Sequence, residues 1–248
     1  MLKPIDRVRE LEVLQEHVIA CARCARLAHY RRKVAREKRR MYRDEMYWGK
    51  PVPSFGDPEA KLLILGLAPA AHGGNRTGRM FTGDRSGDFL YRALYDAGFA
   101  NQPESRRRDD GLKLANCYIT AALRCAPPKN KPLPQELRNC QPYLEEELRL
   151  LGKVRAVLAL GRIAFDAYLR LVYAGRAGVV APKDLPPRSS FVFGHGVGYA
   201  LPGGLPRLFA SYHPSQQNTQ TGKLTPSMMQ SVLDDIRNFL GLRGGNRE

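Results

Sequence analysis

The spacing of apolar residues changes from a helical to a strand-like pattern along the chain. Over residues 6–30 apolar positions recur every three or four residues, which predicts an amphipathic helix with Cys21 and Cys24 on one face. From residue 61 onward, short continuous apolar runs alternate with longer amphipathic segments. Such runs are typical of buried parallel strands, and we expect strands at residues 62–65, 118–123, 154–160 and 208–211.

The segments between these runs predict helices. We expect them at residues 86–97, 134–151, from residue 162 onward, and 227–240. Residues 175–206 are rich in Gly and Pro and predict an irregular excursion, and the last residues predict a loose tail. Alternating strands and helices define the α/β class, with a parallel sheet and helices on both faces. Ligands of such sheets bind beyond the carboxyl ends of the strands.

The length predicts one domain. A chain of 248 residues can bury one sizeable core and is short for two. We expect a single domain over 1–248, with a helical, cysteine-bearing and basic segment at 1–50, an α/β core at 51–241 and the tail at 242–248.

The charge indicates a polyanionic partner. The chain has 40 Lys and Arg against 24 Asp and Glu, a net charge of +16, and nucleic acid is the first partner to consider. We expect no membrane partner, because no apolar run approaches the ~18 residues of a spanning helix. The first residues lack the apolar core of a signal peptide. The expected location is therefore the cytoplasm, at the nucleoid.

Residues 31–45 concentrate this charge, with eight Arg or Lys against three acidic residues. One interpretation is the solvated face of a helix. The other is an arm that contacts phosphates.

Four cysteines form two pairs, Cys21-x2-Cys24 and Cys125-x14-Cys140. Disulfides are not expected where thiols stay reduced. A close pair and a split pair suit an iron–sulfur cluster. A zinc ion on the same thiolates is the alternative, although zinc ligands usually come as two close pairs. Cys117 is expected to be a core residue. Four thiolates would leave no open iron, so the chemistry must lie elsewhere.

Three loops follow predicted strand ends. The first, residues 66–84, is rich in Gly, and small residues let backbone N–H groups approach a ligand closely. The second, residues 124–132, is stiffened by prolines that would hold Asn130 in place. The third, residues 211–223, opens with His213 and then runs polar. Each signal alone is weak, because a Gly-rich turn and a single His are often structural.

Together the motifs GLAPAAHGGNRTGRMFTGDRSG (66–87), RCAPPKNKP (124–132) and SYHPSQQNTQTG (211–222) are specific. With the four cysteines, they make the chain resemble the uracil-DNA glycosylase superfamily over roughly residues 10–240. The likeness is greatest to family 5, the iron–sulfur or type B enzymes. The resemblance implies a three-layer α/β/α sandwich around a four-stranded parallel sheet. It also implies a structural 4Fe-4S cluster on Cys21, Cys24, Cys125 and Cys140, and a monomer that excises deaminated bases from double- and single-stranded DNA.

The resemblance also implies roles for individual residues. His213 would hydrogen-bond the departing base, Asp84 would stabilise the sugar cation or orient water, and Asn130 would contact the base or its sugar. Asp84 has a structural alternative as a helix N-cap, and Phe81, expected to stack on the base, has one in core packing. The other residues expected around the base are Gly66, Leu67, Ala68, Ala70 and Ala121. Those expected to contact DNA are Ser215, Gln216, Gln217, Asn218, Arg76 and Arg79.

Two departures from related families affect the expected chemistry. Leu67-Ala68-Pro69-Ala70 stands where family 1 carries a water-activating acid, and Ala121 stands where family 4 carries an Asn that reads the pyrimidine. A site without that Asn loses a group that rejects other bases. We therefore expect activity on hypoxanthine and xanthine besides uracil.

A protein of another class would also explain part of the sequence. A non-catalytic nucleic-acid-binding module with a structural metal accounts for the charge and the cysteines. It leaves the three strand-end loops without a role.

Overall fold

The computed structural model describes residues 4–176 and 184–242. In chain order its elements are α1 (Pro4–Ile19), α2 (Ala25–Glu37), η1 (Arg40–Tyr42), β1 (Phe55–Gly56), β2 (Leu62–Gly66), α3 (Gly74–Thr77), α4 (Arg85–Asp96), β3 (Cys117–Ala121), η2 (Pro128–Asn130), α5 (Pro134–Leu150), β4 (Ala156–Leu160), α6 (Arg162–Tyr173), η3 (Arg188–Ser190), β5 (Gly198–Tyr199), β6 (Arg207–Ser211), α7 (Gln216–Gln220) and α8 (Pro226–Leu240).

The sheet has the order β1-β3-β2-β4-β6-β5. Its four central strands are parallel, as expected, and each lies within two residues of the predicted bounds. The strand count differs from the predicted four because β1 and β5 add antiparallel edges. Each edge strand has only two residues, which is too short to leave an apolar run in the sequence.

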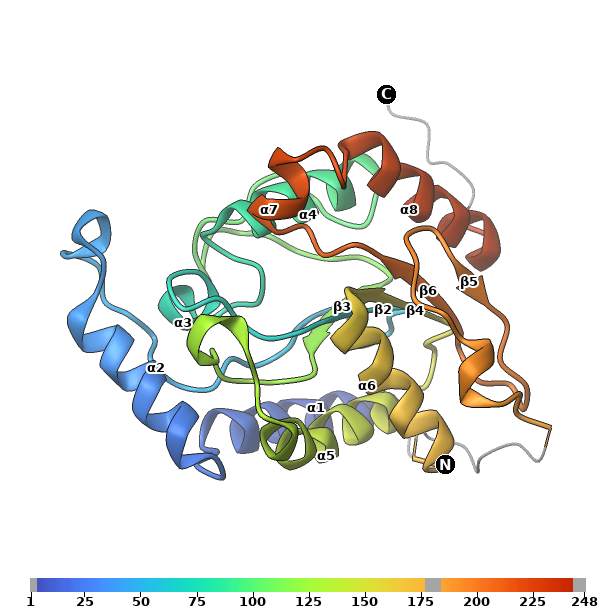
Figure 1. Cartoon of the computed structure of the whole chain (residues 1–248), viewed down its shortest axis with the longest axis horizontal. Coiled ribbons are helices and arrows are strands. Elements are labelled where there is room, and N and C mark those ends of the chain that lie inside the picture. Colours follow the sequence, from blue (N-terminus) through green and yellow to red (C-terminus); the bar gives the residue numbers. More distant parts are fainter. Residues whose placement is uncertain (1–3, 177–183, 243–248) are drawn as a thin grey trace.

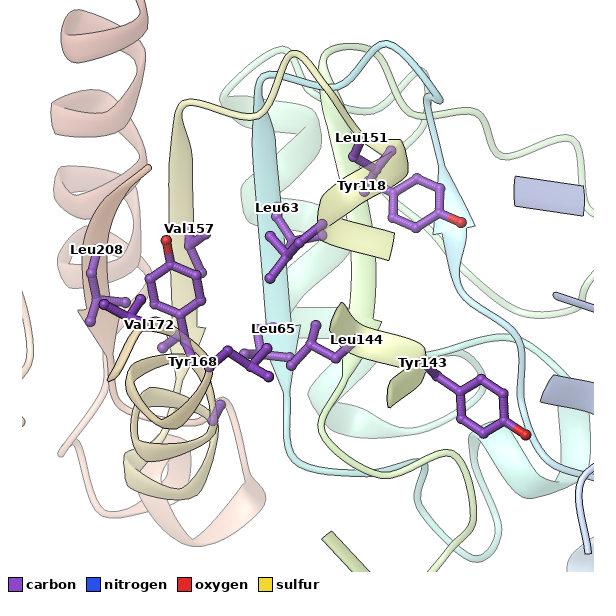
Figure 2. Packing of buried hydrophobic residues seen from close by; sticks show 14 of the residues in the cluster. Leu63, Leu65, Tyr118, Tyr143, Leu144, Leu151, Val157, Tyr168, Val172 and Leu208 are labelled. Atoms are coloured by element: carbon purple, nitrogen blue, oxygen red, sulfur yellow. The ribbon is translucent and has the colours of Figure 1, made fainter. Parts of the chain in front are cut away.

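Helices cover both faces of the sheet (Figure 1). Successive strand side chains point to opposite faces. Leu63 and Leu65 of β2 therefore join one hydrophobic cluster with α1, α5 and α6 (Figure 2), whereas Leu62 and Ile64 join a second cluster with α4 and α8. The α/β class and the three layers expected from the resemblance are confirmed. None of the described helices combines the length and the apolar character needed to cross a membrane.

The helix predicted over residues 6–30 is two helices. α1 ends at Ile19, α2 begins at Ala25, and Cys24 between them is extended, with φ −120° and ψ 93°. The break has a packing reason, because α1 lies along α5 whereas α2 reaches α3. Cys21 and Cys24 therefore lie in a connection and do not share a helix face.

The Gly- and Pro-rich excursion is only partly irregular. Within its described part, η3 forms one turn and β5 pairs with β6. Residues 177–183 and most of the predicted tail, residues 243–248, lie outside the described residues.

Candidate active site

The loops that follow β2 and β3 meet at the end of the sheet where the parallel strands have their carboxyl ends. Gly66 and Ala121 end these strands in register, and the amide groups of Ala122 and Leu123 then donate to the carbonyl groups of Gly66 and Leu67, at 2.9 and 3.0 Å. Two strands away in the sheet order, β6 ends at Ser211, and His213 follows it. The three predicted loops thus leave the sheet at one edge, which Figure 1 shows on the side of α3 and α7.

Phe81 and His213 come from different loops and face one another. Their ring centroids are 5.8 Å apart with an interplanar angle of 32°. The Phe81 ring also lies over Gly66, where an added Cβ would come within 2.8 Å of the ring. Phe81 has a left-handed backbone, with φ 51°, and belongs to the hydrophobic cluster of α4 and α8. It therefore packs in the core and holds its ring beside the imidazole of His213.

The imidazole of His213 is neutral near pH 7. Part of its surface reaches solvent, but burial of the ring lowers its pKa to about 4. The Asn218 side-chain amide donates to the His213 carbonyl at 2.8 Å and fixes the backbone there. A neutral imidazole can donate one hydrogen bond and accept another.

Asp84 takes the capping role considered for it, and its role toward the sugar stays a prediction. One oxygen, Oδ1, accepts from the Gly87 amide at 3.0 Å and so caps α4. The other, Oδ2, lies against Gly73, where an added Cβ would come within 1.9 Å. Burial raises the pKa of Asp84, and the amide groups of Gly87 and Ser86 oppose this shift. One carboxylate oxygen therefore remains directed at the Gly-rich loop.

Gly66 and Gly73 thus serve a purpose that differs from the expected one. The sequence suggested glycines that admit a ligand to the backbone. In the structure they make room for the side chains of Phe81 and Asp84.

The small residues expected around the base are buried or half-buried, and their contact with a base stays a prediction. Ala121 is buried in the same cluster as Phe81. Leu67, Ala68 and Ala70 are half-buried in the loop after β2.

Asn130 is not brought to this group. It lies exposed in η2, where both Lys129 and Asn130 have left-handed φ angles of 55° and 56°. Among the described residues, no side-chain hydrogen bond of Asn130 is found that would direct it to Phe81 or His213. A contact with the base or its sugar remains a prediction for the DNA-bound protein.

Arg76 and Arg79 differ from the predicted phosphate contacts, because both are buried. Arg76 pairs with Glu45 and donates to the carbonyl groups of His72 and Gly83, at 2.8 and 2.7 Å. Arg79 pairs with Asp110 at 2.6 Å and donates to Ser105 at 2.8 Å and to Thr82 at 3.0 Å. Both guanidinium groups form their bonds inside the protein, and these bonds fix the conformation of the Gly-rich loop.

The third loop presents a polar surface. Ser215 caps α7 by accepting from the Asn218 amide, and Gln216 and Gln217 are exposed. Asn218 differs from its neighbours because its side chain turns inward to His213. Gln216 also lines a cavity of about 790 Å³ between α4, α7 and α8, whose lining does not include Phe81, Asp84 or His213.

Two supporting networks were not predicted from the sequence. The Tyr47 hydroxyl lies 2.9 Å from His72 Nδ1, which joins the N-terminal region to the Gly-rich loop. On the other side of β3, Glu147 is fully buried and accepts from Arg124 at 2.5 Å and from Thr120 at 2.6 Å. Thr120 precedes Ala121 and Arg124 precedes Cys125, so this network supports both. The Glu147 network could have been predicted from an acidic residue among the apolar residues of α5. Nothing in the sequence pattern indicated the contact of Tyr47.

The four cysteines predicted as metal ligands lie in one region of the structure. None forms a disulfide, and all four lie on the same hydrophobic cluster, which Cys117 does not join. Burial raises the pKa of Cys125 to about 12 and of Cys140 to about 11, and neighbouring cysteines, Cys21 among them, add to both shifts. Among the described residues, no three or more His, Cys, Asp or Glu side chains form a group that could hold a metal ion.

The fold is that of an α/β protein whose parallel sheet carries, in the loops beyond its strands, an aromatic ring, a neutral imidazole and a buried carboxylate. A family model for the uracil DNA glycosylase superfamily matches residues 53–237. The chain belongs to this superfamily.

Several relatives are similar over most of the chain. A type-5 uracil-DNA glycosylase of Thermus thermophilus is 51% identical over 231 residues, covering 93% of this chain and 99% of the relative. One of Pyrobaculum aerophilum is 45% identical and covers 87% of each chain. A type-4 uracil-DNA glycosylase of Archaeoglobus fulgidus is 32% identical over 114 residues, 46% of this chain.

Proposed function

We propose that this protein is a DNA-repair glycosylase that hydrolyses the N-glycosidic bond of uracil in DNA and also accepts hypoxanthine and xanthine. The observation that carries the proposal is the pairing of Phe81 with a neutral His213 over Gly66. The similarity to type-5 uracil-DNA glycosylases over most of the chain supports it. The proposed substrate is double- or single-stranded DNA at the nucleoid, and the proposed active form is a monomer.

The damaged base has to leave the duplex before it can reach this site. Extrusion costs a few kcal/mol and is least costly for a mispaired base. Phe81 then stacks on the extruded base. The exposed side chains of Gln216 and Gln217 enter the duplex from α7 and occupy the space that the base leaves.

Hydrolysis breaks the bond between the sugar C1′ and the base nitrogen. The electron pair of this bond goes to the base, water adds to C1′, and the proton that water gives up ends on the departed base. The products are a free base and an abasic sugar. His213 donates a hydrogen bond to the base carbonyl as negative charge builds there. A donor that acts mainly in the transition state contributes roughly 10²–10³ in rate.

Asp84 acts on the sugar side of the bond. Its Oδ2, which lies against Gly73, supplies negative charge that stabilises the sugar cation. The side chains from Leu67 to Ala70 carry no group that could activate water, which leaves Asp84 as the acid that acts in the loop after β2.

The breadth of the substrate range follows from Ala121. Its methyl group is buried beside Phe81 and offers no donor or acceptor to a base. A site built on hydrogen bonds rejects analogues because its own buried polar groups would be left unpaired. Stacking and backbone contacts are more permissive, so deaminated purines are accepted. Cytosine survives because it is a poor leaving group and is held by its base pair.

One assay tests the proposal. Single-turnover base release is measured on matched duplexes that carry uracil, hypoxanthine, xanthine or only normal bases. We expect release of all three deaminated bases and no release from the normal duplex. Binding of the uracil duplex without release would establish the non-catalytic nucleic-acid-binding protein instead. Release of uracil alone would contradict the argument from Ala121.

The four cysteines fit an iron–sulfur cluster. Arg31 is buried, its guanidinium lies beside the Cys125 thiol, and its Nε has no hydrogen-bond partner in the described structure. A buried donor without a partner next to a thiol suits an anionic group of thiolates and sulfide. Asn139 also donates to Cys24 Sγ, at 3.4 Å. Each thiolate of a four-iron cluster binds a different iron atom, so the four sulfurs need not converge on one point as zinc ligands do.

The cluster would be architectural, because it would tie the connection between α1 and α2 to the loop after β3 and to α5. The purified protein is then expected to be brown, with bound iron and broad visible absorbance. Cys24→Ala should lose iron and stability, whereas Cys117→Ala, the matched control, keeps its iron. A colourless protein with stoichiometric zinc and full activity would exclude the cluster.

A further inference from the structure

The most exposed apolar side chains of the described chain lie at a basic tip. Met46 is 94% exposed and Met41 is 70% exposed. Both belong to residues 38–46, here called the tip, which also carries Arg39, Arg40 and Arg43. Figure 1 shows the tip standing clear of the rest of the molecule, between α2 and β1 and on the side of α3.

The cations of the tip are available to a partner. Arg39, Arg40 and Arg43 are exposed, and none of them forms an ion pair with a described residue. The tip has two acids, and one of them, Glu45, is paired with Arg76. Unpaired cations and exposed apolar side chains together suit a partner that is negatively charged on its outside and apolar in its interior.

The base of the tip is fastened to the loop that frames the active site. The Tyr42 ring lies 3.9 Å below the Arg76 guanidinium, and the Trp48 amide donates to the Arg76 carbonyl at 2.8 Å. Tyr47 bonds His72 in the same loop, at 2.9 Å. A ligand held by the tip is therefore held in a fixed position relative to Phe81 and Asp84.

We propose that the tip is a second DNA-contacting element, in which Met41 and Met46 wedge against the base stack and Arg39, Arg40 and Arg43 bind the flanking phosphates. Methionine is among the side chains that unstack base steps when inserted as apolar wedges. Its unbranched, polarisable side chain adapts to irregular apolar surfaces. This inference rests on the proposed function, because the DNA held by the tip would be the DNA that carries the damaged base.

Two variants separate the wedge from the charge. M41Q/M46Q removes the apolar ends at nearly constant size, and R39Q/R40Q/R43Q removes three cations. The matched control is V192T, because Val192 is 63% exposed but lies between η3 and β5, outside the tip. All variants keep the full chain and are compared on a duplex and on a single strand that each carry one uracil.

Insertion of the two methionines is detected from the fluorescence of 2-aminopurine, which is placed in turn at each position flanking the uracil. We expect the wild type to unstack one step at the lesion and a second step beside it. M41Q/M46Q should lose only the second signal and bind the duplex ~10-fold more weakly, which corresponds to ~1.4 kcal/mol. V192T should retain both signals.

The charge is detected by salt dependence. Each phosphate contact contributes about 0.9 to the slope of log K against log salt. R39Q/R40Q/R43Q should therefore lower that slope by about 2.7. Unchanged affinity, slope and 2-aminopurine signals in both variants would overturn the proposal. So would unchanged DNA binding by M41Q/M46Q with loss of a wild-type self-association, because the tip would then bind protein. Failure of the wild type to release uracil would contradict the proposed function instead, and these binding measurements would still decide the role of the tip.

Discussion

Two loops at the same edge of the sheet look alike in sequence and differ in structure. Residues 66–84 and residues 211–223 both follow a parallel strand and both are rich in polar side chains. In the first loop Asn75, Arg76, Arg79 and Thr82 are buried and bonded within the protein. In the second loop Gln216, Gln217, Gln220 and Thr221 are exposed.

The difference separates two functions that polarity alone does not distinguish. The buried polar side chains of the first loop hold Phe81 and Asp84 in place, so a change of one of them acts on the fold. The exposed polar side chains of the second loop are left for a ligand, so a change of one of them acts on binding. The comparison would fail if a buried polar side chain of the first loop acted only on binding, or an exposed one of the second loop only on the fold.

The largest effect is expected from Arg79→Gln. The change leaves the buried carboxylate of Asp110 without its charged partner. Breaking a buried ion pair from one side costs about 3–5 kcal/mol. Chemical denaturation should show this loss in the free energy of unfolding. The double change Arg79→Gln with Asp110→Asn should recover part of it. If Arg79→Gln were as stable as the wild type and only weakened DNA binding, Arg79 would be a phosphate contact after all.

His213→Ala is expected to have the next largest effect. Loss of the donor to the departing base should lower the single-turnover rate on uracil by ~10²–10³. The loss should be greater on hypoxanthine, because a poorer leaving group depends more on stabilisation of its charge. Single-turnover kinetics at saturating enzyme checks both ratios. Equal and small losses on both bases would assign His213 to packing against Phe81.

Asp84→Asn separates charge from helix capping. Asn is as good an N-cap as Asp, so α4 and the stability should be retained. The amide cannot stabilise a sugar cation, and the single-turnover rate should fall by ~10² while duplex affinity stays close to that of the wild type. Asp84→Ala, which also loses the cap to Gly87, is the comparison variant and should lose stability in addition. A wild-type rate in Asp84→Asn would leave Asp84 with the capping role alone.

The sequence predicted the parallel sheet and the positions of its strands, because a strand buried on both faces leaves a continuous apolar run. It did not predict the two edge strands, which are two residues long, or the break after Ile19, which packing of α1 and α2 on different partners imposes. Phe81, Asp84 and His213 could be named from motifs. The burial of Arg76 and Arg79 could not, because their acidic partners Glu45 and Asp110 lie about 30 residues away in sequence.

The pH dependence follows from two pKa shifts of opposite kind. Burial lowers the pKa of His213 to about 4, so this group stays neutral from pH 5 to 8, and burial raises the pKa of Asp84, so its carboxylate takes up a proton earlier as the pH falls. The wild-type rate should therefore decrease as the pH falls, and the decrease should begin at a higher pH than an ordinary Asp would give.

Asp84→Asn tests this assignment directly. Its residual rate should be level from pH 5 to 8, because the remaining group does not titrate in this range. His213 also makes the free energy of unfolding depend on pH, in a direction that its two pKa values determine. The unfolded His213, with a pKa near 6.5, binds a proton that the folded state resists. His213 therefore reduces stability as the pH falls below about 6.5 toward 4. An inflection near pH 6.5 in the rate of Asp84→Asn would show that His213 titrates normally.

The smallest effect on the fold is expected in the second loop, where two neighbouring residues sharpen the comparison. Gln217 is exposed on α7, and Gln217→Ala should change the free energy of unfolding by no more than about 0.5 kcal/mol. The variant should bind a uracil duplex several-fold more weakly than the wild type does. It should bind a single strand almost as the wild type does, because a single strand leaves no gap to fill.

Asn218→Ala, one residue further on, removes the 2.8 Å hydrogen bond to the His213 carbonyl and should instead lower the single-turnover rate with little change in affinity. Binding titrations and single-turnover rates on the same two substrates check both variants. If the two variants had the same profile, α7 would act as one unit, and the distinction between its outward and inward side chains would be wrong.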